Sequence, residues 1–416
     1  MRFLFAACLL VSAASAQAVK PKDVREAGKG GSAAIPRLTE YLKDPSTDVR
    51  VEAVKQLTEL RALDALLLAT RDNEAEVQLR ATDGLVNYYL PGYVQTGFAS
   101  SLKKVGGSIK SRFTDTNDQV LDPSITARED VVKSLGALAR GGMGMEARAN
   151  AARAVGILRG KAAVPDLLEA LRSKDTDVLY ESLIALQKIR DEAAAPKFEF
   201  LLRDMNQKVQ IAAIETTGLL RNQGAVGDLI EVLNRAKDAK VRRAALGSLA
   251  MLPEAKTRAV YQQYLTDKDE KMRACAAEGF GRLRDPADSA MIDQAWQSEG
   301  KPAARVSLAF AMVMLGRTEI SEFSALQYLV NNLNSSAYKG EAQPFLMELA
   351  RNSSVRTALY GPMDTGTKDE KIGLARVFAR SGDKESVPHL ERMSHDPDTE
   401  VAQEGLRALR NLQSRL

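Results

Sequence analysis

The chain has 416 residues, and its 58 lysines and arginines nearly balance its 54 aspartates and glutamates, which gives a net charge of +4. This near balance does not indicate a specific nucleic-acid-binding protein, because such domains are usually strongly basic. A chain of this length suggests two or three globular domains unless it forms one repeat array. Its composition, 45% hydrophobic with only 5% aromatic residues, is typical of packed helices.

Residues 1–16 have the pattern of a secretory signal peptide. Arg2 supplies a basic start, residues 3–14 form an apolar run, and the small residues 14–16 form a cleavage site before Gln17. The apolar run is too short to span a bilayer. We therefore expect it to be removed and the protein to be exported, either to a periplasm or out of the cell. The alternative is a buried N-terminal helix.

Removal of this segment leaves one cysteine, Cys275, so the mature chain has no disulfide framework. Cys275 lies on the apolar side of a predicted helix, where a free cysteine usually behaves as a small buried hydrophobic residue. No later run reaches 18 apolar residues, and we expect no transmembrane segment after cleavage.

Residues 17–32 are polar and contain Gly28-Lys-Gly-Gly31. A phosphate-binding loop needs a longer spacing that ends in Gly-Lys-Ser or Gly-Lys-Thr, so we predict a flexible lead-in. Residues 33–90 follow with two helical repeats, in the first of which Pro36 and Val49 are 13 residues apart.

An irregular insertion, residues 91–126, interrupts the helical pattern. Loops longer than about 12–15 residues are usually functional or disordered. The insertion combines aromatic and basic residues that are candidates for partner binding. These candidates are Tyr93, Phe98, Lys103, Lys104, Lys110, Arg112 and Phe113. They suit a protein partner, a polyanion or a membrane surface; the alternative is that the insertion folds back and covers the neighbouring repeats.

Residues 127–416 carry the rest of the array, whose clearest part is a fourfold repeat between residues 162 and 283. The second segments of the four copies begin at Val178, Val209, Val241 and Met272, at spacings of 31, 32 and 31 residues. A period of this length marks a repeat architecture. Each segment has apolar residues at helical spacing and a small residue four positions on, which lets the next helix approach closely. These small residues are Ser182, Ala213, Ala245 and Ala276.

The first segments begin with a proline in the copies at Pro165 and Pro196, where a first helical turn tolerates its missing N–H. Each copy is therefore a pair of antiparallel helices. Two looser pairs follow, at 322–333 with 339–349 and at 355–360 with 370–380, the second with a predicted loop at 361–366. We expect about eleven stacked pairs, which at roughly 8–10 Å between packed helices would extend on the order of 100 Å.

The pattern Ala-x-x-Pro-x-Leu-x-x-x-Leu of residues 162–171, followed by Asp-x-x-Val-Arg-x-x-Ala-x-x-x-Leu as in 238–249, resembles the HEAT repeat in the short form shared with bilin-lyase-like repeats. The resemblance covers most of the chain after residue 16. It implies an all-α fold, an α-solenoid, and a role as a binding scaffold rather than an enzyme.

The sequence predicts no catalytic residue, metal site or cofactor. Its two histidines, His389 and His395, are six residues apart, which does not place them on one helical face. Nucleophile elbows and glycine-rich dinucleotide loops are absent. Many aspartates, among them Asp44, Asp48, Asp175 and Asp177, lie at predicted turns and helix starts, where they are expected to serve as caps.

Arginine recurs one residue after the start of the second segments, at Arg50, Arg242, Arg273 and Arg305. The last three are candidates for a basic ladder that contacts a partner along the inner groove. The alternative, which the family pattern also implies, is a ladder of arginine–aspartate pairs between repeats.

We therefore predict an exported, non-catalytic scaffold that binds an unidentified protein partner through its concave helix face and the insertion. One alternative is a bilin-lyase-like enzyme or tetrapyrrole binder. Another is a polyanion or membrane-surface binder acting through the basic and aromatic residues of the insertion.

Overall fold

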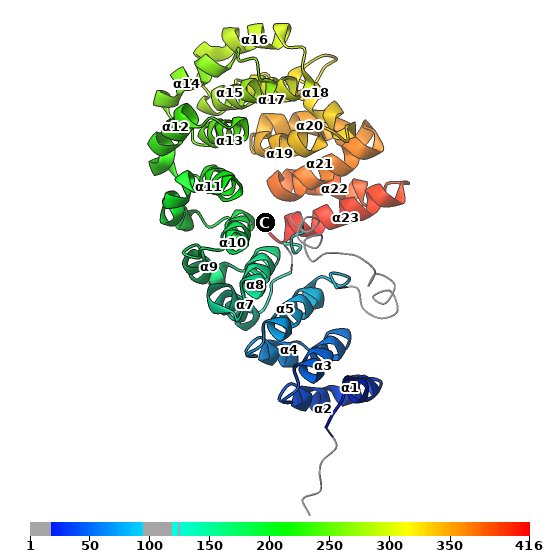
Figure 1. Ribbon diagram of the computed structural model, residues 1–416. Helices are drawn as coiled ribbons and strands as arrows, with labels where there is room; N and C mark the ends of the chain where they lie inside the picture. The colour runs from blue at the N-terminus through cyan, green and yellow to red at the C-terminus, as the bar shows by residue number, and fades with distance from the viewer. Residues whose placement is uncertain (1–17, 95–118, 124) are drawn as a thin grey trace, which may run out of the picture.

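The computed structural model describes residues 18–94, 119–123 and 125–416, and all regular structure in these ranges is helical (Figure 1). The predicted all-α solenoid is confirmed. The described residues form eleven helix pairs, in agreement with the expected number.

The N-terminal part contains one helix more than the sequence predicted. Its elements are α1 (Pro21–Gly28), η1 (Gly31–Ala34), α2 (Ile35–Tyr41), α3 (Thr47–Glu59), α4 (Leu63–Ala69) and α5 (Ala75–Tyr89). The lead-in expected to be flexible therefore contains α1. The Lys20 N–H donates to the Asp23 carboxylate at 2.9 Å, and the fully buried Val24 belongs to the apolar core with residues of α3. The helix forms because it covers the end of the first repeat.

The remaining pairs follow at intervals of about one repeat. The first five are α7 (Glu129–Gly141) with α8 (Met145–Ile157), α9 (Val164–Ala170) with α10 (Thr176–Ile189), η4 (Glu192–Arg203) with α11 (Gln207–Leu219), α12 (Val226–Arg235) with α13 (Ala239–Ala250), and α14 (Arg258–Tyr264) with α15 (Glu270–Leu283). The last four are α16 (Ser289–Ser298) with α17 (Pro302–Met314), α18 (Ala325–Asn331) with α19 (Lys339–Leu349), α20 (Ser353–Thr365) with α21 (Lys368–Ser381), and α22 (Val387–Met393) with α23 (Thr399–Gln413).

Capping residues fix where the second helices begin. The Asp175 carboxylate accepts hydrogen bonds from the N–H groups of Asp177 and Val178, both at 3.0 Å. Asn206, Asp238, Asp269 and Asp398 cap their helices in the same way. These side chains satisfy backbone donors that have no partner within the helix, which explains the recurrence of polar residues at this point of the repeat.

Small residues let successive second helices approach closely. Ala213, Ala245 and Ala276 are fully buried. A side chain at Gly156 would lie 2.7 Å from the Ala185 backbone, and one at Gly281 would lie 2.8 Å from the Ala311 backbone. Since atoms do not approach so closely without displacement, glycine is required at these two crossings.

The loop expected at 361–366 is wrong, because α20 continues through Pro362 to Thr365. Proline removes one backbone donor, but the fully buried Leu359 and the nearly buried Met363 hold the last turn against the core. Burial of this apolar face outweighs the loss of one hydrogen bond.

The stack curves so strongly that its C-terminal end returns to its middle. In Figure 1 the pairs from α7 to α23 form a ring, from which the N-terminal pairs project. The region where α21 and α23 lie opposite α8, α10 and residues 119–123 is called the seam below. The Leu121 N–H donates to the Ile157 carbonyl at 2.8 Å, and Asp122 forms an ion pair with Arg407 of α23 at 3.8 Å.

Candidate functional site

The ring encloses a cavity of about 1320 Å³ that is lined from both sides of the seam. Its charged lining residues are arginines and glutamates, with nine of the former against four of the latter. The arginines are Arg159, Arg190, Arg221, Arg282, Arg284, Arg351, Arg376, Arg380 and Arg415, and the glutamates are Glu192, Glu278, Glu348 and Glu404. The lining therefore carries a clear excess of positive charge, although the whole chain is nearly neutral.

Four of these arginines occupy the same place in their repeats. Arg159, Arg190, Arg221 and Arg284 follow the second helices α8, α10, α11 and α15, twelve residues after Ala147, Val178, Val209 and Met272. They are called the first bank below. Because they share a repeat position, the curvature of the solenoid places their side chains along one wall of the cavity.

All four arginines of the first bank have a left-handed backbone conformation, with φ of 53°, 60°, 54° and 54°. This conformation costs an ordinary residue about 1–2 kcal/mol, and glycine is the usual residue at such helix ends. Gly316 has a positive φ of 109° at the equivalent position after α17. Arginine thus stands where glycine is easier to accommodate, and Arg61, which lies outside the cavity lining, has the same conformation with φ of 53°.

This conformation leads to a stability prediction. Arg221→Gly is expected to raise the free energy of unfolding by about 0.5–1 kcal/mol, because relief of the left-handed strain exceeds the entropy that glycine adds to the unfolded chain. The matched variant Arg221→Ala keeps the strain and should show no such gain. Urea unfolding followed by circular dichroism compares the two. A glycine variant less stable than the alanine variant would contradict the left-handed conformation.

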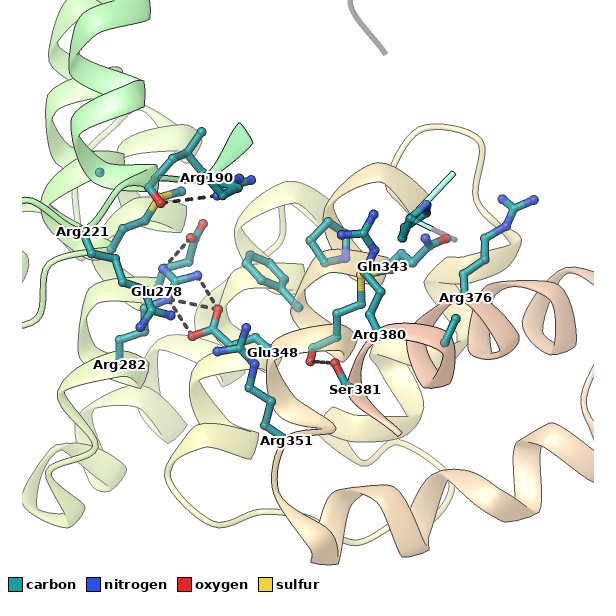
Figure 2. A pocket seen from close by; sticks show the side chains of 18 of the residues that line it. Arg190, Arg221, Glu278, Arg282, Gln343, Glu348, Arg351, Arg376, Arg380 and Ser381 are labelled. Atoms are coloured by element: carbon teal, nitrogen blue, oxygen red, sulfur yellow. Dashed lines mark hydrogen bonds and ion pairs between the residues drawn. The ribbon is translucent and has the colours of Figure 1, made fainter. Parts of the chain in front are cut away.

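The opposite wall is formed by Arg351, Arg376, Arg380 and Arg415, which are called the second bank. Arg376 pairs with Glu404 at 3.1 Å, and Arg415 donates to the carbonyls of Ala379 and Gly382 at 3.2 and 3.1 Å. Within the described residues, the guanidinium groups of Arg351 and Arg380 have no hydrogen-bond or ion-pair partner. Figure 2 shows Arg380 and Arg351 on this side, with Arg190 and Arg221 across from them.

The two banks act on each other electrostatically. Burial lowers the pKa of Arg159, and the charge of Arg380 lowers it further. Burial also lowers the pKa of Arg190, with Arg380, Arg159 and Arg221 adding to the effect. These side chains line the cavity, where arginines outnumber glutamates. An anion placed between the banks would therefore be strongly stabilised.

A buried ion-pair cluster forms one part of the wall. Arg282 of α15 pairs with Glu278 at 3.1 Å and with Glu348 of α19 at 3.0 Å, and the Ser307 hydroxyl donates to Glu278 at 3.1 Å. Burial raises the pKa of Glu278, while Arg282 opposes the rise. The cluster joins two repeats and neutralises Arg282, so this arginine serves the fold rather than a ligand.

Apolar side chains also line the cavity. Met251, Met314 and Met347 line the cavity together with Pro253 and Pro344. Methionine side chains adapt to irregular apolar partners. Phe345, which is 8% exposed, is the one aromatic residue among the described lining residues. The wall therefore suits a ligand with acidic and apolar groups, and it lacks the aromatic platforms on which bases stack.

The described residues gather no group of three or more metal-ligating side chains. Burial raises the pKa of the Cys275 thiol, which disfavours the reactive thiolate. His389 stacks on Tyr360 at a ring distance of 3.8 Å and lies outside the cavity lining. No helix in the described ranges is long and apolar enough to cross a membrane.

The predicted arginine ladder lies elsewhere. Arg242, Arg273 and Arg305 stand near the starts of α13, α15 and α17, whereas the first bank follows the opposite ends of second helices. Arg273 contacts Glu299 at 2.6 and 2.9 Å, and Arg305 lies 4.0 Å from the Trp296 ring. Their guanidinium groups thus bind within the array, which favours the structural interpretation.

The other arginines of that series agree with this placement. Arg242 contacts the Tyr264 hydroxyl at 3.3 Å, and Arg50 forms the expected pair with Asp72 of the next repeat at 2.8 Å. Partner binding through Arg242, Arg273 and Arg305 stays a prediction that these contacts do not support.

Of the insertion candidates, only Tyr93 falls within the described residues. It is half-buried against the apolar core, where burial raises its pKa to about 12 and the charge of Asp83 adds to the rise. Phe98, Lys103, Lys104, Lys110, Arg112 and Phe113 lie outside the described residues.

The comparisons with known proteins agree with the repeat architecture. A family model described as HEAT repeats matches residues 132–216, 198–260 and 228–313. No curated protein sequence matches the chain.

Several solved structures resemble the chain weakly. An engineered protein is 17% identical with a TM-score of 0.38, over 91% of this chain and 98% of that one. The Escherichia coli protein YibA is 16% identical with a TM-score of 0.41, over 72% of this chain and 98% of that one. A structure of the CpcE and CpcF complex of phycocyanin lyase from Nostoc sp. PCC7120 is 17% identical with a TM-score of 0.31, over 85% and 100% of the two chains. Similarity at this level does not extend to function. The chain is an α-solenoid, and its residues 132–313 match the family model for HEAT repeats.

Proposed function

We propose that the protein is an exported, non-catalytic scaffold that binds an acidic segment of a partner polypeptide in the arginine-lined cavity. The observation that carries this proposal is the first bank, in which Arg159, Arg221 and Arg284 have no side-chain partner among the described residues and face a second row of arginines. Guanidinium groups bind carboxylates through paired hydrogen bonds.

The cavity favours a polypeptide over a small ion. Its volume of about 1320 Å³ exceeds the roughly 300–1000 Å³ of most small-molecule sites. The methionines of the lining offer contacts for apolar side chains of the same segment. A peptide with alternating acidic and apolar residues satisfies both kinds of lining.

Export rests on the sequence pattern of residues 1–16. Its consequence is a mature chain that begins at Gln17, which the intact mass of the protein purified from its native compartment measures. A mature chain that still carries residues 1–16 would contradict export by a cleaved signal.

The binding proposal predicts a loss of affinity when arginines of the first bank lose their charge. Arg190→Gln combined with Arg221→Gln should weaken binding of an acidic, methionine-containing peptide by at least about 100-fold, because each lost hydrogen bond to a charged group contributes about 1.5–3 kcal/mol. Glutamine keeps the backbone strain of arginine, so stability should change little. Fluorescence anisotropy with a labelled peptide measures the affinity.

The control for this experiment is Arg172→Gln, which removes an exposed arginine outside the cavity lining and should leave affinity unchanged. Equal binding by the double variant and by the control would contradict the proposal. A tetrapyrrole, which also carries carboxylates on an apolar framework, is the alternative ligand. Its binding would appear as a shift in the visible absorbance spectrum, and failure of the acidic peptide together with such a shift would favour it.

A further inference from the structure

The seam differs from every other junction of the array in what holds it. One apolar cluster runs from Val24 to Ala311 and a second from Val306 to Leu412, and the two meet at α17. No buried apolar cluster of the described residues joins α21 or α23 to α8 or α10. The ring is therefore continuous along the chain but has no apolar core across the seam.

The groups that do face each other across the seam are mostly of like charge. Arg380 of α21 acts on Arg159 and on Arg190, which follow α8 and α10. The ion pair between Arg407 and Asp122 is attractive, but the Arg407 side chain is 65% exposed and the two charged groups are 3.8 Å apart. Exposed pairs of this kind contribute little. With the cavity empty, electrostatics oppose closure.

We infer that the acidic ligand closes the ring: its carboxylates bridge the first and second banks, and without it the C-terminal pairs α20–α23 move away from α8 and α10. This inference rests on the proposed function and adds how the site is regulated. A ligand that contacts both banks binds the closed form better than the open form, and this difference in affinity shifts the population. In a solenoid each repeat contacts mainly its neighbours, so small adjustments along the stack suffice to open the seam.

Distance measurements between spin labels test the inference. The labels are attached to Ala193→Cys, after α10, and Gln403→Cys, on α23, in the mature chain with Cys275→Ala. Both positions are exposed and neither lines the cavity. At low salt the free protein is expected to give a broad distribution of long distances. Addition of an oligoglutamate peptide with interspersed methionines should produce one narrow, shorter distance.

A second variant separates charge repulsion from other causes. Arg380→Gln removes the arginine that opposes Arg159 and Arg190, so it should shift the free protein towards the short distance. Arg392→Gln removes an exposed arginine outside the cavity lining from α22 and should leave the distribution broad.

Peptide binding is measured by anisotropy in the same samples, which distinguishes the possible results. Binding without a change in distance overturns the inference and leaves the proposed function standing. Absence of binding contradicts the proposed function and the inference with it. A narrow, short distance in the free protein at low salt overturns the inference in either case.

Discussion

Ala245→Arg is expected to lower the free energy of unfolding by about 4 kcal/mol or more, because it overpacks a full site and leaves a buried charge without a partner. Ala245 lies in α13 and is completely buried where this helix packs between α11 and α15. The stack must separate locally to admit the new side chain. Thermal unfolding followed by circular dichroism measures the loss.

The same helix provides the control for this variant. Ala239, in the first turn of α13, is exposed, so Ala239→Arg should change stability by less than about 0.5 kcal/mol. Equal melting temperatures for the two variants would mean that the register assigned to the second helices is wrong.

Arg282→Met is expected to destabilise the protein by about 3–5 kcal/mol at neutral pH, since removing one partner of a buried ion pair leaves the others uncompensated. Arg282 is 11% exposed and pairs with both Glu278 and Glu348, so the variant leaves two carboxylates without the arginine that binds them. By contrast, Arg376→Met breaks a pair in which the arginine is 43% exposed, and its cost should stay below about 1 kcal/mol.

The loss in Arg282→Met should shrink on acidification. Burial already raises the pKa of Glu278, and removal of Arg282 raises it further. A carboxyl group with a raised pKa binds more protons in the folded than in the unfolded protein, so stability increases as pH falls towards the ordinary glutamate pKa of about 4.3. Urea unfolding of both proteins at neutral pH and near pH 5 measures this. A difference between variant and wild type that does not depend on pH would contradict the role given to Glu278.

The helix pairs could be predicted because their causes are local. The 3.6-residue apolar period, the proline at the first turn and the cap before Val178 all lie within one repeat, and each repeat supports the same interpretation. Predictions failed where packing outweighed a local signal. The glycines before residue 32 suggested flexibility, yet burial of Val24 holds α1 in place, and Pro362 suggested a loop, yet burial of Leu359 extends α20.

The cavity could not be predicted, because it depends on how far each pair rotates relative to the next. Small rotations add up over the array, and no single repeat contains the information that Arg380 returns to face Arg159. The first bank nevertheless left a signal in the sequence. Arginine recurs twelve residues after Ala147, Val178, Val209 and Met272, as regularly as it does at Arg273 and its equivalents.

The placement of the first bank also sets a rule for the ligand. Arg159, Arg190 and Arg221 come from consecutive repeats, whose second helices pack roughly 8–10 Å apart, while an extended peptide advances about 3.3–3.6 Å per residue. In an extended peptide with an acidic side chain at about every third residue, successive acidic side chains would therefore each contact one of the three arginines. Affinity would therefore rise with the number of matched charges, as in multivalent binding. In the next repeat Pro253 occupies the same position. The spacing of arginines is therefore interrupted by one repeat before it resumes at Arg284.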